Sequence, residues 1–359
     1  MLASAISLTA CGKEPLYQEQ GYVFGTLVEV SIYGTEEARA KQAVATVMQE
    51  FQRLHNLLHA WKPSALSELN AALAQGKTKE VSSELAAILR DAAQLSAQSD
   101  NLFNPAIGGM VQLWGFHADE FQSALPDQKK LAVVVAAKPQ MSDLIFHSLP
   151  LSPSRLRPPR FALPASGRGV LVSSRNSAVQ LDLGGYAKGY ALDSAVALLK
   201  QQGISNALIN IGGNVLALGA HGARAWRVGI QHPRQPGPIA TLELHDGEAI
   251  GTSGDYQHYF MVGGQRYCHL IDPRSGQPVQ GVQAVTVLTR GDHAGVRSDA
   301  VSKPLFISGR AAWRNAAKQM GLTEALLIDG HGIIHLTTAM QKRLEFVDKK
   351  MVPEMERVN

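Results

Sequence analysis

The sequence lacks several features that would assign a protein to a class directly. Its 359 residues include only two cysteines, Cys11 and Cys268, so no disulfide framework holds the fold together. No apolar run reaches the roughly 18 residues that span a bilayer. Lys and Arg are scattered at a net charge of +4, which does not support a nucleic-acid-binding protein. With 45% hydrophobic residues, the chain is expected to be globular with an ample core.

The first positive feature is the stretch Val179–Asp193, which reads VQLDLGGYAKGYALD. Residues 180–183 predict the end of a strand, and the apolar spacing over 187–200 predicts a helix. Gly184 and Gly185 between them allow a positive φ and the close approach of a ligand, and a helix N-terminus favours an anion such as phosphate. A tight turn without a ligand is an equally good interpretation of this segment alone. The G-x-G-x-x-G fingerprint is absent and the segment has no GK[ST], so both common nucleotide-binding motifs fail.

The N-terminus, MLASAISLTACG, is a short apolar run that ends in LTAC at residues 8–11. It resembles the lipobox of bacterial lipoproteins, in which the cysteine is lipidated and becomes the first residue of the mature chain. A basic n-region is missing, and an accidental apolar leader is the alternative interpretation. We expect residues 1–20 to be a lipoprotein signal and tether, with Cys11 holding the protein on the periplasmic face of the bacterial inner membrane.

Strand and helix patterns alternate irregularly along the chain, which favours an α+β fold over a doubly wound sheet. The expected elements are a strand over 21–33, helices over 36–58 and 82–99, a helical turn with Ser64 or Ser67 as its N-cap, strands within 207–262 and over 284–289, and a helix from 298. The segment 150–169, rich in Pro, Ser and Arg, is expected to form an excursion over the surface.

Several motifs occur together in a fixed order. They are FGT, HAWKPSALSELN, NPAIGGMVQLWGF, DLGGYAKGYALD, NIGGNV, TSGDYQHYF, HLIDPRSGQPV and SDAVSKPLF. From about Gly21 to about Gly330 they closely resemble the flavin transferase (ApbE) family. The resemblance implies a single large ApbE-type, T-fold-like α+β domain with mixed sheets and packed helices, over residues 21–345, followed by a C-terminal tail at 346–359.

The resemblance also implies an activity. Members of the family split FAD and transfer FMN to a Thr or Ser hydroxyl of a target protein, releasing AMP and using Mg²⁺. The targets are typically subunits of membrane redox complexes, such as sodium-pumping quinone reductases and Rnf-type complexes. Two alternatives keep FAD as the ligand: a flavin-binding lipoprotein without transferase activity, and a Mg²⁺-dependent FAD pyrophosphatase that passes FMN to water.

The catalytic and metal-binding residues follow from the same motifs. His269 aligns with the family's general base, and an imidazole titrates in the range where it can accept a hydroxyl proton. Asp255 is expected either to orient the base or the acceptor, or to cap a turn. Asp299 is the expected Mg²⁺ ligand, with a helix N-cap as its alternative role. A backbone carbonyl at Gly185, or at Ala187, is expected to reach the metal.

The remaining predicted residues contact the flavin nucleotide. The side chain of Lys188 supplies positive charge to the phosphates. The residues expected to line the pocket are Phe24, Trp61, Phe103, Asn104 and Ile271, of which Phe24 and Trp61 could equally be core aromatics.

Lys303 departs from the family pattern, which places a Thr hydroxyl at this position to help hold the metal. A charged ammonium has no lone pair and cannot ligate Mg²⁺. Lys303 therefore either replaces positive charge beside the phosphates or marks a weakened metal site. Because residues i and i+4 share one helix face, Asp299 and Lys303 are expected to form an ion pair.

Overall fold

A mixed sheet of nine strands forms the centre of the computed structural model, which describes residues 15–118, 123–147, 169–349 and 354–356. The strands, in spatial order, are β1 (Leu16–Val23), β2 (Thr26–Tyr33), β6 (Ala207–Ile211), β7 (Asn214–Leu218), β10 (Glu248–Gly254), β13 (Val282–Arg290), β14 (Glu324–Asp329), β15 (Ile334–Thr337) and β17 (Glu354–Glu356). All neighbours pair antiparallel except β15 and β17, which are parallel.

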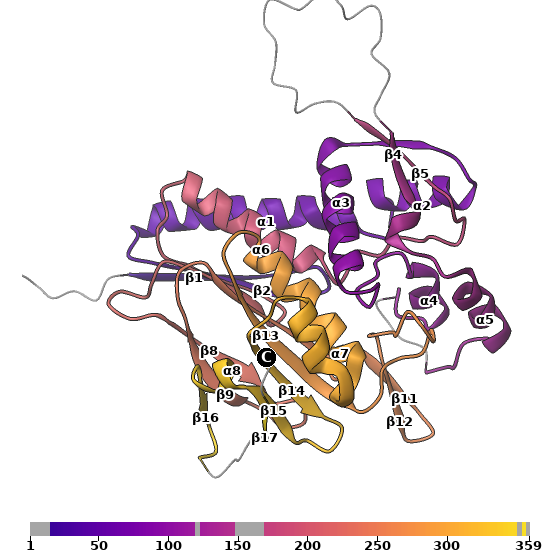
Figure 1. Ribbon diagram of the computed structural model, residues 1–359. Coiled ribbons are helices and arrows are strands. Elements are labelled where there is room, and N and C mark those ends of the chain that lie inside the picture. Colours follow the sequence, from indigo (N-terminus) through magenta and orange to yellow (C-terminus); the bar gives the residue numbers. More distant parts are fainter. Residues whose placement is uncertain (1–14, 119–122, 148–168, 350–353, 357–359) are drawn as a thin grey trace, which may run out of the picture.

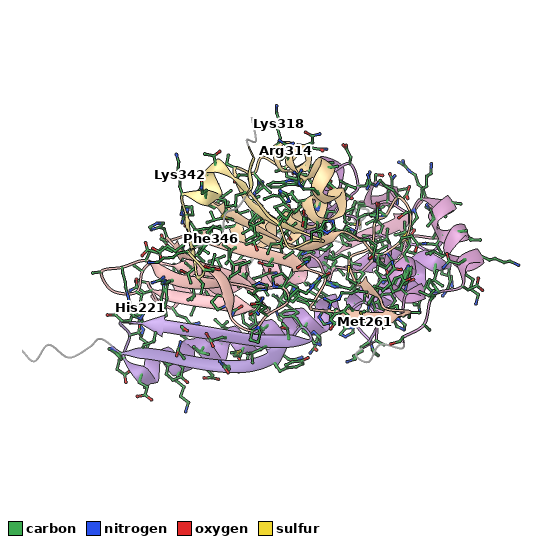
Figure 2. All side chains as sticks on the ribbon, turned by 90° about the horizontal axis from the view of Figure 1, so that it is seen from below. His221, Met261, Arg314, Lys318, Lys342 and Phe346 are labelled. Carbon is green, nitrogen blue, oxygen red and sulfur yellow. The ribbon has the colours of Figure 1, made fainter. Side chains whose placement is uncertain are left out.

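Three long helices cover one face of this sheet: α1 (Glu37–Leu58), α6 (Ala187–Gln201) and α7 (Ala294–Gln319) (Figure 1). They bury alternate strand residues, because successive side chains of a strand point to opposite faces. The other face packs against a small sheet of β8 (Trp226–Gln231), β9 (Pro238–Leu244) and β16 (Leu344–Phe346), together with α8 (Thr338–Gln341). Outward from the sheet, Arg314 and Lys318 project from the C-terminal part of α7 (Figure 2).

The remaining elements gather at one end of the large sheet (Figure 1). They are α2 (Ala65–Ala74), α3 (Ser83–Gln98), α4 (Gly108–Leu113), α5 (Gln128–Ala137), the 3₁₀ turn η1 (Met141–Asp143), the sheet of β3 (Lys79–Val81), β4 (Leu144–His147) and β5 (Val170–Ser174), and the hairpin of β11 (Tyr259–Val262) and β12 (Gln265–Cys268). The α+β class expected from the sequence is confirmed.

The N-terminal strand differs from the prediction. Residues 21–33 are not one strand but parts of a hairpin, in which Phe24 and Gly25 form the turn with φ values of 56° and 69°. Two central residues at positive φ are typical of a tight two-residue hairpin turn. β1 begins at Leu16, inside the expected tether, and β17 lies in the expected tail, so the sheet extends beyond the predicted bounds of 21 and 345.

The helix starts follow their capping residues. The Glu36 side chain accepts from two backbone N–H groups of α1, Ser64 and Ser67 form a reciprocal capping box at α2, and Ser82 caps α3. The predicted start of the last long helix at 298 is wrong, because α7 begins at Ala294.

Some predictions lie outside the described residues. Cys11 belongs to the undescribed part of the chain, and so does the segment 150–169 except for Gly169. Cys268 is a buried free thiol. In the part of the chain that the structure describes, none of the helices is both long enough and apolar enough to cross a bilayer.

Candidate active site

A cavity of about 780 Å³ opens beside the β1–β2 turn, the C-terminal end of α1 and the Gly184–Gly185 turn. Its volume falls in the range of small-molecule and cofactor sites. Ten of the site residues predicted from the sequence line it: Phe24, Trp61, Phe103, Asn104, Gly185, Ala187, Lys188, His269, Ile271 and Lys303. The fold therefore brings together side chains that are up to 279 positions apart in the sequence (24 to 303).

The Gly184–Gly185 turn is shaped by space rather than by unusual backbone angles. Neither glycine has a positive φ, so the first reason that the sequence suggested for glycine is wrong, and the close approach of a ligand stays a prediction. A Cβ atom on Gly185 would lie 3.1 Å from Cε of Lys303, and one on Gly184 would lie 3.1 Å from Oδ1 of Asp182. The Asp182 carboxylate also fixes the turn by accepting from the Gly184 N–H at 2.8 Å. Glycine here lets Lys303 pass close to the backbone.

Asp299 and Lys303 form the predicted ion pair on one face of α7. The Lys303 ammonium donates to Oδ1 of Asp299 and, at 2.6 Å, to the main-chain carbonyl of the same residue. The second carboxylate oxygen, Oδ2, accepts from the Gly189 N–H at 3.0 Å. Asp299 is completely buried, and the side chain of Lys303 is 13% exposed where it borders the cavity.

The charges of Lys188 and Lys303 influence the protonation of Asp299. Burial alone would raise the pKa of Asp299, but Lys303 and Lys188 hold that pKa below its usual value, so the carboxylate is ionised. Burial lowers the pKa of Lys303, and the charge of Asp299 opposes this shift. The N-cap role considered for Asp299 is wrong, because it lies in the second turn of α7. The Asp193 carboxylate caps that helix instead, accepting from the N–H groups of Gly295 and Val296 at 2.8 Å each.

His269 faces the cavity with one ring nitrogen fixed. Its Nδ1 lies 3.2 Å from the carbonyl oxygen of His258, which can only accept, so the proton is on Nδ1 and Nε2 keeps its lone pair. Enclosure in the cavity, with the neighbouring His258 and Lys188, lowers the pKa of His269 to about 3. The imidazole is therefore neutral at physiological pH, in the form that a general base requires.

The aromatic residues form one wall of the cavity. The Phe24 ring packs edge-on against Phe51 and His55, at centroid distances of 6.2 and 5.7 Å. Trp61 donates from its indole N–H to Oδ2 of Asp182 at 3.2 Å and lies 5.3 Å from the ring of His117. Both rings therefore have structural partners and also border the cavity, and their contact with a flavin stays a prediction.

Phe103, Asn104 and Ile271 are buried residues at the edge of the same space. The Asn104 side chain forms two hydrogen bonds with the main chain. It donates to the Pro139 carbonyl at 2.9 Å and accepts from the Ala106 N–H at 3.1 Å. These contacts shape the loop before α4. Phe103 and Ile271 contribute apolar surface, at 4% and 3% exposure.

Asp255 is engaged by two arginines. Its carboxylate accepts a bidentate pair from Arg234, at 2.7 and 2.6 Å, and a longer contact of 3.4 Å from Arg266. Such a bidentate pair fixes the carboxylate in place. Asp255 thus ties the β8–β9 connection to β12, and its action on the base or the acceptor stays a prediction.

The ApbE family model matches residues 24–327 of the chain. The chain belongs to the ApbE family. It is 42% identical over 334 residues to an FAD:protein FMN transferase of Rhodobacter capsulatus, a match that covers 93% of this chain and 59% of that relative. It is also 30% identical over 280 residues to an FAD:protein FMN transferase of Klebsiella pneumoniae, covering 76% and 78%.

A solved structure supports the fold. The crystal structure of the ApbE protein of Thermotoga maritima superposes with a TM-score of 0.77 at 24% identity, covering 92% of this chain and 99% of that one. Against the Rhodobacter capsulatus relative, the chain spans about three fifths of the longer protein's length.

The residues at the predicted ApbE metal position do not fit a Mg²⁺ ion. Mg²⁺ binds oxygen donors, usually one or two carboxylates. Here one oxygen of Asp299 bonds the Lys303 ammonium and the other bonds the Gly189 N–H. Within the described ranges, no group of three or more His, Cys, Asp or Glu side chains is arranged to hold a metal. The space beside Asp299 holds a fixed positive charge instead.

Two further residues that line the ApbE cavity, His258 and Ser253, were not predicted from the sequence as site residues. His258 supplies the carbonyl that orients His269, and its ring lies 5.3 Å from the His269 ring. Ser253 bonds the Ser302 hydroxyl at 2.8 Å and so links β10 to the helix that carries Lys303. His258 and Ser253 both line the cavity, and both lie in the motif TSGDYQHYF. The motif therefore located these two residues without indicating their roles.

Proposed function

We propose that this ApbE-family protein transfers FMN from FAD to a Thr or Ser hydroxyl of a target protein and releases AMP. The observation that carries the proposal is the neutral imidazole of His269, fixed through Nδ1 to a carbonyl, in a cavity that also contains Lys188 and Lys303. A base and fixed cations are what attack on a pyrophosphate requires. The activity named for the two relatives is the same.

Each wall of the cavity has a task in this reaction. The flavin ring would lie beside Phe24 and Trp61, because aromatic surface and a flavin ring stack favourably. The pyrophosphate would lie over the Gly184–Gly185 turn, within reach of the two lysines. Since Lys188 and Lys303 help to lower the pKa of His269, arrival of the phosphates would compensate their charge and raise the basicity of the imidazole.

The chemical step is a single displacement at phosphorus. The acceptor hydroxyl oxygen bonds to the phosphorus of the FMN half, and the bond from that phosphorus to the bridging oxygen breaks. AMP leaves with the bridging oxygen and its electron pair. The hydroxyl proton passes to Nε2 of His269, which releases it to solvent. We assign no step to Mg²⁺, because Asp299 is already engaged by Lys303.

The test is incubation of the purified protein with FAD and soluble domains of membrane redox subunits. Covalent flavin is read as fluorescence of the denatured acceptor, and AMP is measured by chromatography. An acceptor with its target Thr changed to Ala is the matched control. Free FMN and AMP without covalent flavin would identify a pyrophosphatase. Bound but unchanged FAD would identify a flavin-binding protein.

We also propose where the protein acts. The LTAC sequence at residues 8–11 supports lipidation at Cys11 and attachment to the periplasmic face of the inner membrane. An anchored enzyme diffuses in the same plane as membrane redox complexes, which supports a subunit of such a complex as the acceptor.

A further inference from the structure

We infer that the Lys303 ammonium takes the place of a divalent cation in this site, so that the protein catalyses FMN transfer without bound metal. The inference rests on the proposed function and concerns how its charge is supplied. Displacement at a pyrophosphate adds negative charge to the bridging and non-bridging oxygens, and fixed cations stabilise it without reorganisation. The question is which group supplies that charge in this chain.

The Asp299 carboxylate is fully occupied. Both carboxylate oxygens already have partners, Lys303 on one side and the Gly189 N–H on the other. The main-chain oxygen of Asp299 is also used, by Lys303 at 2.6 Å and by the Ser302 hydroxyl at 2.8 Å. A metal ion at this carboxylate would lie next to an ammonium, and the repulsion between the two cations would oppose its binding.

The Lys303 side chain runs along the Gly184–Gly185 turn. It passes Gly185 so closely that a Cβ on that residue would lie 3.1 Å from Cε. Lys303 thus reaches the floor of the cavity beneath the turn that approaches the phosphates, and it borders the cavity itself. A side chain at position 185 would press on Lys303, which would have to shift by a few tenths of an ångström. The absence of a side chain at Gly185 thus leaves the room that the Lys303 side chain occupies.

The buried charges beneath the cavity do not add up to a net negative charge. Lys303 neutralises Asp299, so this buried pair adds no net negative charge under the phosphates. Lys188, in the first turn of α6, lines the same cavity as Lys303, and among the described residues no carboxylate forms an ion pair with it. Phosphates therefore meet an electropositive floor with no metal present.

The experiment compares the wild-type protein with Lys303→Thr and with Lys318→Thr. Lys318 is exposed, lies beyond the break in α7 at Gly309 and projects away from the sheet (Figure 2), so it is a control for loss of one lysine. Covalent flavin on an acceptor and AMP release are measured in excess EDTA and across a Mg²⁺ titration. Binding of Mn²⁺ alone is measured separately by electron paramagnetic resonance, and circular dichroism checks that each variant is folded.

We expect wild-type and Lys318→Thr transfer rates in EDTA within about threefold of those in Mg²⁺, with no stoichiometric Mn²⁺ binding. We expect Lys303→Thr to lose at least tenfold in EDTA, to recover in Mg²⁺, and to bind one Mn²⁺. These magnitudes reflect replacement of one electrostatic contact to the transition state, of the size seen when single stabilising donors are removed.

Two results would overturn the inference: wild-type transfer that is abolished by EDTA with one Mn²⁺ bound, or a wild-type protein that is inert at every Mg²⁺ concentration beside an active Lys303→Thr variant. The first result depends on wild-type measurements alone, so a misfolded variant does not prevent the decision. If no protein transfers flavin under any condition, the proposed function fails. Mn²⁺ binding to the wild type then still decides whether lysine has displaced metal.

Discussion

The crossing of α6 and α7 gives the sharpest prediction, through Gly189→Ala. A Cβ atom at this position would lie 2.4 Å from the Gly295 carbonyl oxygen and 2.7 Å from Cα of Val296. The shorter distance is about 1 Å below ordinary van der Waals contact, and the obstructing atoms are backbone. The two helices must therefore separate by about 1 Å. The Gly189 N–H would also move away from the Asp299 carboxylate, which it reaches at 3.0 Å.

The cost of this change can be estimated from its parts. Overpacking costs about 1–3 kcal/mol, a hydrogen bond to a charged group is worth about 1.5–3 kcal/mol, and Ala gains about 1 kcal/mol over Gly in a helix. We expect the free energy of unfolding to fall by about 2–5 kcal/mol. Because α7 carries Lys303 and α6 carries Lys188, we also expect FMN transfer to fall about 100-fold, the effect of a 1 Å misplacement.

The assay is urea unfolding followed by circular dichroism, together with transfer rates corrected for the folded fraction. Gly109→Ala on α4 is the matched control, because its Cβ would lie 3.6 Å from Val134, at ordinary contact distance. We expect this control to stay within about 1 kcal/mol of wild type. If Gly189→Ala unfolds at the wild-type urea concentration and transfers flavin at the wild-type rate, the two backbones do not meet as described.

Other changes test the site and its location. His269→Ala is expected to retain FAD binding, followed by flavin fluorescence, and to lose about 10²–10⁴-fold in transfer, and a wild-type rate would assign the base elsewhere. Because the pKa of His269 is lowered from 6.5 to about 3, the imidazole is deprotonated from about pH 5 upward. The pH profile of kcat/KM for FAD should therefore show no acid limb near 6.5, and an inflection there that His269→Ala removes would contradict this. Asp193→Ala removes the cap of α7 and should lower the free energy of unfolding by about 1–2 kcal/mol, measured in urea against Asp193→Asn. Cys11→Ala should shift the protein from the membrane to the soluble fraction in cells that lack its acceptor, and unchanged membrane fractionation would argue against a lipid anchor.

Local sequence predicted those elements whose ends are specified by neighbouring residues. The caps at Glu36, Ser64 and Ser82 lie next to the helices they start, so α1 and α3 begin within one residue of their predicted starts. For α2 only the cap was predicted, because its ten residues exceed the single helical turn expected. The start of α7 was not predictable, because its cap, Asp193, lies 102 residues before Gly295 in the sequence. The same limit applies to Phe24, since apolar alternation continues through its turn and hides the hairpin.

Most of the cavity could be predicted from motifs, but its electrostatics could not. The motifs placed His269, Lys188 and Lys303 at one site, and the i,i+4 spacing indicated the pair with Asp299. The bidentate contact of Arg234 with Asp255 joins positions 21 residues apart on different elements. Sequence periodicity contains no information on such a contact, because it is set by how two loops approach in the folded chain.

The pairing of β4 with β5 has a practical consequence for handling this protein. His147 pairs with Leu171, so the chain leaves this small sheet and re-enters it at adjacent points. The register of the two strands is set by their own four pairs, from Leu144 with Ser174 to His147 with Leu171. Purification tags, fluorescent reporters or crosslinking handles inserted between these two positions would leave both strands joined in the same way. This junction therefore offers an internal labelling point for a protein whose N-terminus is expected to carry a lipid.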